Sequence, residues 1–286
     1  MILIADCGST KVDWCVVENG EIAVHVSTVG INALLMTEVE IADIIGRELM
    51  PAIEGYAIDE VHYYGAGCIS AEVCDNVRRA IALHIPAATI EVNTDLLAAA
   101  RALCGREKGI ACILGTGSNS CFYDGENIVD NVSPLGYILG DEGSGAVLGR
   151  LLVGDVLKNQ LSPELCDKFL RQYNLDTLEI IHRVYREPQP NRFLASVSPF
   201  LLENMEEPAI HRLVLNSFKS FFVRNISHYD GYREMPINFI GSIAYYYRDV
   251  LKEAADAIDA TLGKIEVSPM DGLVAYHSNP SGSVKE

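Results

Sequence analysis

The stretch LGYILGDEGSGAVLG, residues 135–149, places five glycines around two adjacent acids, Asp141 and Glu142. Glycines at this density let a backbone approach a ligand closely and adopt positive φ angles. The acids between them could accept hydrogen bonds from hydroxyl groups or hold the water shell of a metal ion. A simple surface loop before a helix needs only one or two glycines. We interpret the stretch as a ligand-binding loop, the alternative being a plain Gly-rich loop.

The composition describes a globular protein with ample material for a core. The 286 residues are 49% hydrophobic and 21% charged, which suggests one large or two medium domains. The formal net charge of −17 argues against nucleic acid or an anionic membrane as a partner. A phosphate ligand is still compatible with this charge, because helix N-termini and a bound divalent cation supply local positive potential.

The chain shows no signal for export or for membrane insertion. No apolar run approaches the length of a membrane span, and the first residues, MILIAD, lack a basic start and a signal-peptide core. We therefore expect a cytoplasmic protein. The eight cysteines are scattered through apolar segments without a CxxC pair, so buried free thiols are expected rather than a zinc or iron–sulfur site.

The chain opens with a pattern typical of three antiparallel strands. An apolar run at 2–5 ends at Asp6, and further strands are predicted over 12–17 and 21–27. The first turn, D-C-G-S-T-K, can present backbone N–H groups, two hydroxyls and Lys11 to a phosphate, with Asp6 placed to hold the water shell of Mg²⁺. The alternative is an ordinary hairpin turn.

The same pattern returns later in the chain. Residues 109–114 and 120–123 read as strands joined by the turn G-T-G-S, followed by a short strand over 128–132. An internal repeat of this size predicts two similar domains facing each other. Helices are expected over about 37–50, 70–84, 96–104, 143–159, 163–173, 175–185, 191–203, 207–229 and from 245 to about 260. A third glycine turn, G-S-I-A at 241–244, suits close approach to a purine or its ribose.

Asp95 follows a predicted strand over 89–92 and precedes an Ala-rich helix. Either Thr94 or Asp95 would serve as the N-cap of that helix. Alternatively, Asp95 is a carboxylate at the carboxyl end of a strand, where open α/β sheets bind their substrates. The chain contains no GxxxxGK[ST], GxGxxG, GxSxG, HExxH or EF-hand pattern, which argues against P-loop, Rossmann and several hydrolase sites.

Taken in order, these turns resemble the motifs of the actin–hexokinase–sugar-kinase superfamily. They are most similar to its N-acetylglucosamine kinase branch, which is related to the activator ATPases of 2-hydroxyacyl-CoA dehydratases and benzoyl-CoA reductases. The residues that carry the resemblance are D-C-G-S-T-K at 6–11 (usually D-G-G-G-T-K), T-D at 94–95, G-T-G-S at 115–118, G-D-E-G-S at 140–144 and G-S-I-A at 241–244. They span nearly the whole chain.

The resemblance implies an α/β fold in which two ribonuclease-H-like (actin-like ATPase) domains flank a central cleft. The expected domains are residues 1–110 and 111–286. The second would carry a helical insertion over about 143–235, and the last helix is a candidate to pack back on the first domain.

The resemblance also implies roles for individual residues. Asp95 matches the catalytic base, and Asp6 would hold Mg²⁺ through water. Contacts to ATP fall on Gly8, Ser9, Thr10, Lys11, Gly115, Thr116, Gly117, Ser118, Gly241 and Ser242. Contacts to the sugar fall on Asn32, Asp95, Thr116, Leu135, Gly136, Asp141 and Gly145. Relatives with defined amino-sugar specificity have G-W-G where this chain has Leu135-Gly136 after Ser133-Pro134, so the stacking tryptophan is replaced by leucine.

The implied reaction is transfer of a phosphoryl group from MgATP to an amino sugar, most directly to the 6-hydroxyl of N-acetylglucosamine. Glucosamine or another hexosamine is an alternative substrate. Two other classes remain open: an ATPase activator that carries a bridging iron–sulfur cluster, and a sugar sensor without turnover. Family members are often dimers, so a homodimer is an expectation.

Overall fold

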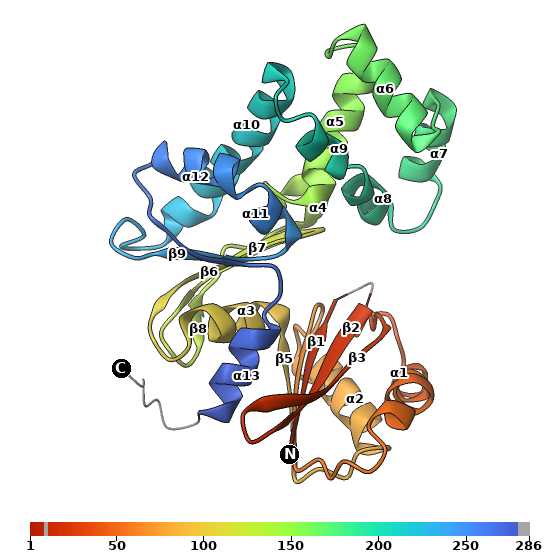
Figure 1. Ribbon diagram of the computed structural model, residues 1–286, viewed down its shortest axis with the longest axis vertical. Helices are drawn as coiled ribbons and strands as arrows, with labels where there is room; N and C mark the ends of the chain where they lie inside the picture. The colour runs from red at the N-terminus through yellow and green to blue at the C-terminus, as the bar shows by residue number, and fades with distance from the viewer. Residues whose placement is uncertain (9–10, 280–286) are drawn as a thin grey trace. The chain divides into compact units, whose positions relative to one another are not determined.

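Two five-stranded sheets with the same strand order form the framework of the computed structural model, which describes residues 1–8 and 11–279 (Figure 1). The chain divides into two units. The first unit comprises Met1–Lys108, Asp124–Ile128 and Pro269–Glu286, and the second comprises Gly109–Tyr123 and Val129–Ser268. Each unit is described by itself.

The first sheet has the strand order β3-β2-β1-β4-β5. Strands β1 to β3 form an antiparallel meander, whereas β4 and β5 run parallel to β1. The hairpin between β2 and β3 turns at Asn19 and Gly20, which both have positive φ, as a two-residue turn requires. The strands are β1 (Ile2–Cys7), β2 (Lys11–Glu18), β3 (Glu21–Val29), β4 (Glu60–Gly65) and β5 (Thr89–Thr94).

Helices cover both faces of this sheet. Because side chains alternate along a strand, Leu3 of β1 packs into one core with Ile41 of α1, while Ile4 packs into the other with Leu273 of α13. The helices are α1 (Glu38–Ile44), α2 (Ala71–Ala82), α3 (Asp95–Cys104) and α13 (Met270–Ser278). The helix expected over 37–50 is regular only to Ile44, and π-helical and 3₁₀ turns follow up to Pro51, whose nitrogen cannot donate a hydrogen bond.

The second sheet has the order β10-β9-β6-β7-β8, which repeats the first sheet strand for strand when β6 is matched to β1. Its strands are β6 (Gly109–Leu114), β7 (Ser118–Tyr123), β8 (Ile128–Asp130), β9 (Ile237–Ile240) and β10 (Leu262–Glu266). The predicted internal repeat and the α/β class with two ribonuclease-H-like sheets are therefore confirmed.

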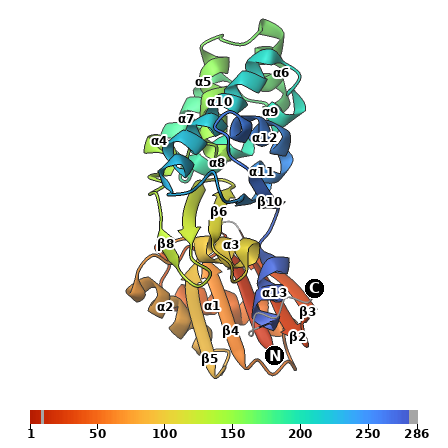
Figure 2. The ribbon, with the colours of Figure 1, turned by 90° about the vertical axis from the view of Figure 1, so that its left-hand side faces the viewer.

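Most helices of the second unit lie between β8 and β9 in sequence. Figure 2 shows α5, α10 and α12 together on one side of the second sheet. The helices are α4 (Gly136–Leu139), α5 (Gly145–Leu157), α6 (Pro163–Tyr173), α7 (Thr177–Tyr185), α8 (Pro190–Ser196), α9 (Pro199–Glu203), α10 (Pro208–Arg224), α11 (Ser242–Tyr246) and α12 (Arg248–Asp256). None of the helices in the described part of the chain has the length and apolar character that crossing a membrane requires.

Three predicted helices of this unit are divided or shortened. The helix expected over 191–203 is two helices, because Pro199 has no N–H to continue the first. The helix expected over 207–229 ends at Arg224, where the side chain of Asn225 donates to the carbonyl of Phe221. The helix after 241 breaks at Tyr247. The short helix α4 was not predicted.

Gly149 of α5 permits the closest helix contact of the second unit. A Cβ atom at this position would lie 1.8 Å from the carbonyl oxygen of Leu194 in α8, far inside van der Waals contact. Gly154, one turn further along the same helix, has open space around the equivalent position. The glycine at 149 is therefore a packing requirement that helps to fix α5, whose first turn borders the loop of Asp141.

We expect Gly149→Ala to lower the free energy of unfolding by about 1–3 kcal/mol, because the added methyl overpacks the α5–α8 contact. Gly154→Ala is the matched control and should raise it by about 0.5–1 kcal/mol through helix propensity alone. Urea denaturation of both variants checks this. Equal changes in the free energy of unfolding for the two variants would contradict the close contact between Gly149 and Leu194.

Candidate active site

The candidate site residues of the first unit lie where three parallel strands end. Cys7 of β1 pairs with Gly65 of β4, and Gly65 pairs with Thr94 of β5, so the carboxyl ends of the strands form one edge. The N–H of Ala66 donates to the carbonyl of Cys7 at 3.1 Å and closes this edge. Asp95 follows directly after β5. The topology thus brings Asp95 to the edge where Asp6 also lies.

Thr94, and not Asp95, is the N-cap of α3. Its backbone is extended, with φ −76° and ψ 153°, and its hydroxyl accepts a hydrogen bond from the N–H of Leu97 at 3.2 Å. Asp95 is the first residue of the helix, and its Oδ1 accepts from the N–H of Leu96 at 2.9 Å. Because Thr94 supplies the cap, capping does not account for Asp95.

Burial raises the pKa of both Asp6 and Asp95, and the charge of Asp95 adds to the rise at Asp6. Burial, followed by the negative charges of Asp95 and Asp13, raises the pKa of Asp6 to about 7, against an opposing effect of Lys11. Burial raises the pKa of Asp95, while the hydrogen bond from Leu96 acts in the opposite direction. Clustered carboxylates of raised pKa are typical of functional sites.

Cys7 stands where the family motif has glycine, and its side chain points into the core. It is buried, and its thiol donates to the carbonyl oxygen of Ile31 at 3.3 Å. Burial raises the pKa of this thiol to about 11, so it stays protonated. The contact also fixes Asn32 beside the end of β1. Asn32 orders its own loop, since its Oδ1 accepts from the N–H of Leu34 at 3.2 Å.

The predicted phosphate turn after β1 is only partly described. The N–H of Gly8 donates to the carbonyl of Lys11 at 3.0 Å, as expected of a tight turn. The exposed ammonium of Lys11 pairs with Asp13 at 2.6 Å, and Ser27 donates to the same carboxylate. Ser9 and Thr10 lie outside the described residues.

The candidate site residues of the second unit gather at the turn after β6 and the first turn of α5. Gly145 donates its N–H to the carbonyl of Gly115 at 2.8 Å, and Ala146 donates to that of Thr116 at 3.1 Å. The turn is closed by the N–H of Gly115, which donates to Gly117 at 2.9 Å. The side chain of Thr116 is exposed. The helix thus holds the turn in place through its backbone.

Asp141 approaches the same turn from the other side. It has φ 53°, and its Oδ1 accepts from the N–H of Ser118 at 3.4 Å. A Cβ atom on Gly117 would lie 3.2 Å from the Oδ2 of Asp141, which explains the glycine there. Burial raises the pKa of Asp141 to about 6, opposed by the Ser118 N–H and helped by the charge of Glu142.

The third glycine turn, which begins at Gly241, lies against the turn that follows β6. Gly241 has φ 121°, and a Cβ atom here would lie 2.3 Å from the carbonyl oxygen of Leu114, at the end of β6. Gly145 is in contact with the same segment, since its Cβ position lies 3.4 Å from Ile243. Ser242 is exposed next to it. Sequence positions far apart therefore converge within this unit.

Leu135 and Gly136, at the start of α4, are exposed on the surface of the second unit. Both have positive φ, 61° and 75°, which is unusual for leucine. Leu135 is 59% exposed, so its side chain is free to contact a ligand. The neighbouring Gly140 lies under the carbonyl of Pro134, where a Cβ atom would clash.

Glu142 points away from Asp141, and this could not be predicted from the sequence. Its carboxylate, 15% exposed, pairs with Arg224 of α10 at 2.6 Å. The next residue, Gly143, donates its N–H to Ser217 of α10 at 3.1 Å. Helix α10 therefore fixes the loop of Glu142 and Gly143 through two contacts. Arg224 is a residue beside the candidate site that the motifs did not reveal.

Asp6 is the residue that best fits a magnesium ion. The ion commonly binds through one or two carboxylates, retained waters and substrate phosphates. A cation beside Asp6 would offset the repulsion from Asp95 and Asp13 that raises its pKa. In residues 1–8 and 11–279, no group of three or more His, Cys, Asp or Glu side chains could form an all-protein metal site.

Comparison with known proteins places the chain in a family. No protein-family model and no curated protein sequence matches it. Among solved structures, a candidate N-acetylglucosamine kinase from Porphyromonas gingivalis is 50% identical, with a TM-score of 0.95 over 98% of this chain and 99% of its own.

Two more distant structures share the fold. One is a candidate N-acetylglucosamine kinase from Chromobacterium violaceum, 18% identical, with a TM-score of 0.76 over 96% of this chain and 98% of its own. The other is a ROK family glucokinase from Streptomyces griseus, solved with glucose and AMPPNP, 16% identical, with a TM-score of 0.62 over 96% and 97% of the two chains.

Two sheets of one strand order, each with its polar turns at the carboxyl ends of the strands, agree with the sugar-kinase class to which the Porphyromonas protein is assigned. Within that class the chain belongs to the N-acetylglucosamine kinase family, as its 50% identity over nearly the full length of the Porphyromonas protein shows.

Replacing Asp6 with asparagine should stabilise the fold in a pH-dependent manner. Between pH 4 and 7 the folded state holds a proton that the unfolded state has lost, so stability falls as pH rises through this window. The difference between 3.8 and about 7 corresponds to at most about 4 kcal/mol, which solvent screening reduces. Urea denaturation at pH 4 and pH 8 should show a gain for Asp6→Asn that is larger at pH 8.

Asp13→Asn is the matched control with the opposite sign. Burial raises the pKa of Asp13, but hydrogen bonds from Lys11 and Ser27 outweigh it, and the pKa is lowered. This carboxylate therefore stabilises the fold at neutral pH, and the stabilisation is lost in acid. Equal gains for Asp6→Asn at both pH values would argue against the charge repulsion at Asp6.

Proposed function

We propose that the protein transfers the γ-phosphoryl group of ATP to a hydroxyl of an amino sugar, most directly the 6-hydroxyl of N-acetylglucosamine. The observation that supports this is the carboxylate of Asp95, which lies at the same edge of the first sheet as Asp6. The helix does not need Asp95 as its cap, because Thr94 caps α3. Similarity to the Porphyromonas candidate N-acetylglucosamine kinase supports the choice of substrate.

Asp95 is proposed as the general base. Phosphoryl transfer passes through a loose transition state, so the protein mainly positions the groups and neutralises charge. The carboxylate would orient the sugar hydroxyl and accept its proton late in the reaction, with help typically worth about 10²–10⁴-fold. Burial raises the pKa of Asp95, which makes its carboxylate a stronger base than an exposed one.

The glycine turns are proposed to hold the nucleotide. Gly8 and the turn 115–118, with Lys11, Ser9 and Thr10, would border the phosphates, and Gly241 with Ser242 would border the adenosine. A magnesium ion held by Asp6 through water would neutralise charge on the transferred phosphoryl group. The ion pair between Lys11 and Asp13 would exchange for a phosphate contact when ATP binds.

The sugar is proposed to contact Asp95 and Asn32 in the first unit, and Thr116, Leu135, Gly136, Asp141 and Gly145 in the second. Asp141 is suited to accept hydrogen bonds from sugar hydroxyls through its Oδ2, because this oxygen lies beside Gly117, which has no side chain to cover it. Leu135, exposed in place of the family tryptophan, would offer an aliphatic rather than a stacking surface.

We expect Asp95→Asn to lower kcat for phosphorylation by at least about 10²-fold with sugar binding retained, because the amide keeps the shape but cannot accept the proton. A coupled ADP assay and calorimetry with N-acetylglucosamine measure the two quantities. Asp43→Asn, at an exposed position of α1, controls for removal of a negative charge. Full activity of the Asp95→Asn variant would remove Asp95 from the mechanism.

A sugar panel tests the substrate. N-acetylglucosamine should give the highest kcat/KM among N-acetylglucosamine, glucosamine, N-acetylmannosamine, N-acetylmuramic acid and glucose, measured by ADP release and detection of the sugar phosphate. A higher kcat/KM for glucosamine would show that the protein is a glucosamine kinase instead. ADP release without a sugar phosphate would favour the ATPase class, and binding without ADP release would favour a sensor.

A further inference from the structure

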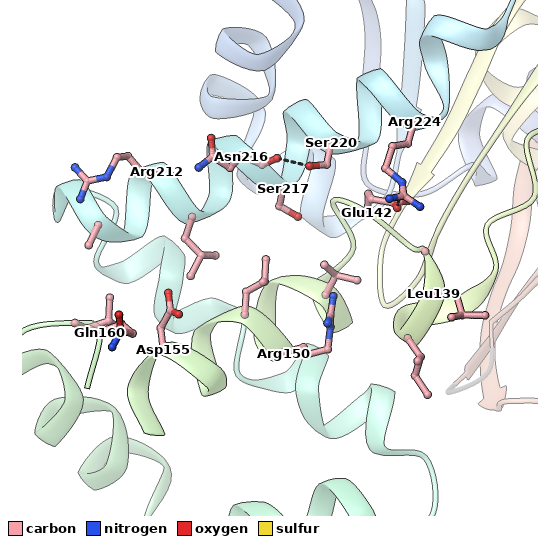
Figure 3. A pocket seen from close by; sticks show the side chains of 17 residues that line it. Leu139, Glu142, Arg150, Asp155, Gln160, Arg212, Asn216, Ser217, Ser220 and Arg224 are labelled. Carbon is pink, nitrogen blue, oxygen red and sulfur yellow. Dashed lines mark hydrogen bonds and ion pairs between the residues drawn. The ribbon is translucent and has the colours of Figure 1, made fainter. Parts of the chain in front are cut away.

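A cavity between α5 and α10 lies behind the loop of Glu142 (Figure 3). Its volume is about 650 Å³, within the range of sites that enclose small organic ligands. Arg150 and Asp155 face it from α5, and Arg212, Asn216 and Arg224 face it from α10. All of its lining residues belong to the second unit.

The cavity concentrates positive charge in an acidic protein. The chain has a net charge of −17, yet three arginines line this one space. In the part of the chain that the structure describes, Arg150 and Arg212 form no ion pair, and Arg224 pairs with Glu142. Arginine presents a planar fork of donors that matches phosphate oxygens, and this makes an anion the natural occupant.

The two ends of the cavity differ in chemistry. Figure 3 shows Arg150 and Arg224 at the end next to Glu142, with Asp155 and Gln160 at the other. Arg150 and Asp155 are five residues apart on α5, or about 7.5 Å along the helix axis. Arg212 of α10 lies at the same end as Asp155 and Gln160 (Figure 3), so this end offers both donors and acceptors to hydroxyl groups.

We propose that this cavity binds a small organic phosphate that carries hydroxyl groups, with the phosphate on Arg150 and Arg224 and the hydroxyls on Asp155 and Gln160. Bidentate contacts from two arginines would hold the phosphate. The proposal does not rest on the proposed function, since it requires neither ATP nor turnover.

A ligand in the cavity would also change the contacts of the loop that carries Asp141. A phosphate on Arg224 competes with Glu142 for the same guanidinium, and Glu142 is adjacent to Asp141. The hydrogen bond from Gly143 to Ser217 ties the same loop to α10. Ligand bound in the cavity therefore acts on the candidate active site through two attachments, both from one helix.

Calorimetry on the full chain without nucleotide tests the site. The probes are glucose 6-phosphate, inorganic phosphate and glucose, and hydrogen exchange locates the bound probe. Glucose 6-phosphate should protect residues 145–157 and 208–224 and bind more tightly than inorganic phosphate. Glucose should give no protection in residues 150–157 and 208–224, which exclude the proposed sugar contact at Gly145.

Variants make the test specific. Arg150→Gln and Arg224→Gln should each weaken glucose 6-phosphate at least about tenfold, since each loses a charge-assisted contact. Arg186→Gln, an exposed arginine outside the cavity, is the matched control and should leave the affinity unchanged. Glu142→Gln should tighten binding, because it frees Arg224 and removes a negative charge from the cavity wall.

Three results would overturn the proposal. They are protection confined to the turns at 115–118 and 241–244, an affinity that Arg150→Gln and Arg224→Gln leave unchanged, and a crystal structure in which a second copy of the chain fills the cavity. None of these depends on whether the protein releases ADP, so the cavity and the kinase reaction fail or succeed separately.

Discussion

The second unit depends on backbone hydrogen bonds from the first turn of α5 to the turn after β6. The N–H groups at the start of a helix lack partners within the helix, and here Gly145 and Ala146 give theirs to Gly115 and Thr116. This contact requires the two backbones to lie close together, and the glycines around it follow from that requirement. Asp141 and Gly241 can reach the same turn only because no side chain fills the space at Gly117 or Gly241.

Much of this arrangement is readable in the sequence because glycine constrains geometry locally. Repeated strand–turn–strand patterns predict two similar sheets, and the strand order of the structure agrees. Helix boundaries are less predictable, because breaks such as the one at Pro199 lie inside amphipathic patterns that continue on both sides. The choice between Thr94 and Asp95 as the cap also needs atomic positions, since both residue types cap helices well.

Contacts between distant segments could not be predicted at all. Glu142 and Asp141 are neighbours in one motif, yet one faces the glycine turn and the other faces Arg224, eighty-two positions later. No local pattern marks Arg224, because an arginine at the end of a helix is common and favourable there for its charge alone.

Raised pKa values at Asp6 and Asp141 share one physical cause, which is burial beside other acids. Such groups lower the stability of the folded chain at neutral pH, and their retention fits a binding role better than a structural one.

The buried hydroxyl pair of Ser120 and Tyr229 bears on how separable the helical segment is. The two oxygens lie 2.8 Å apart, and Tyr229 also accepts the N–H of Val132, so the chain just after α10 is bonded to β7 and to the segment after β8. Side chains of β6 share one continuous core with α5 and α10. Residues 145–228 therefore cannot be excised or transplanted as a module. A shortened version of this domain would need a redesigned sheet face.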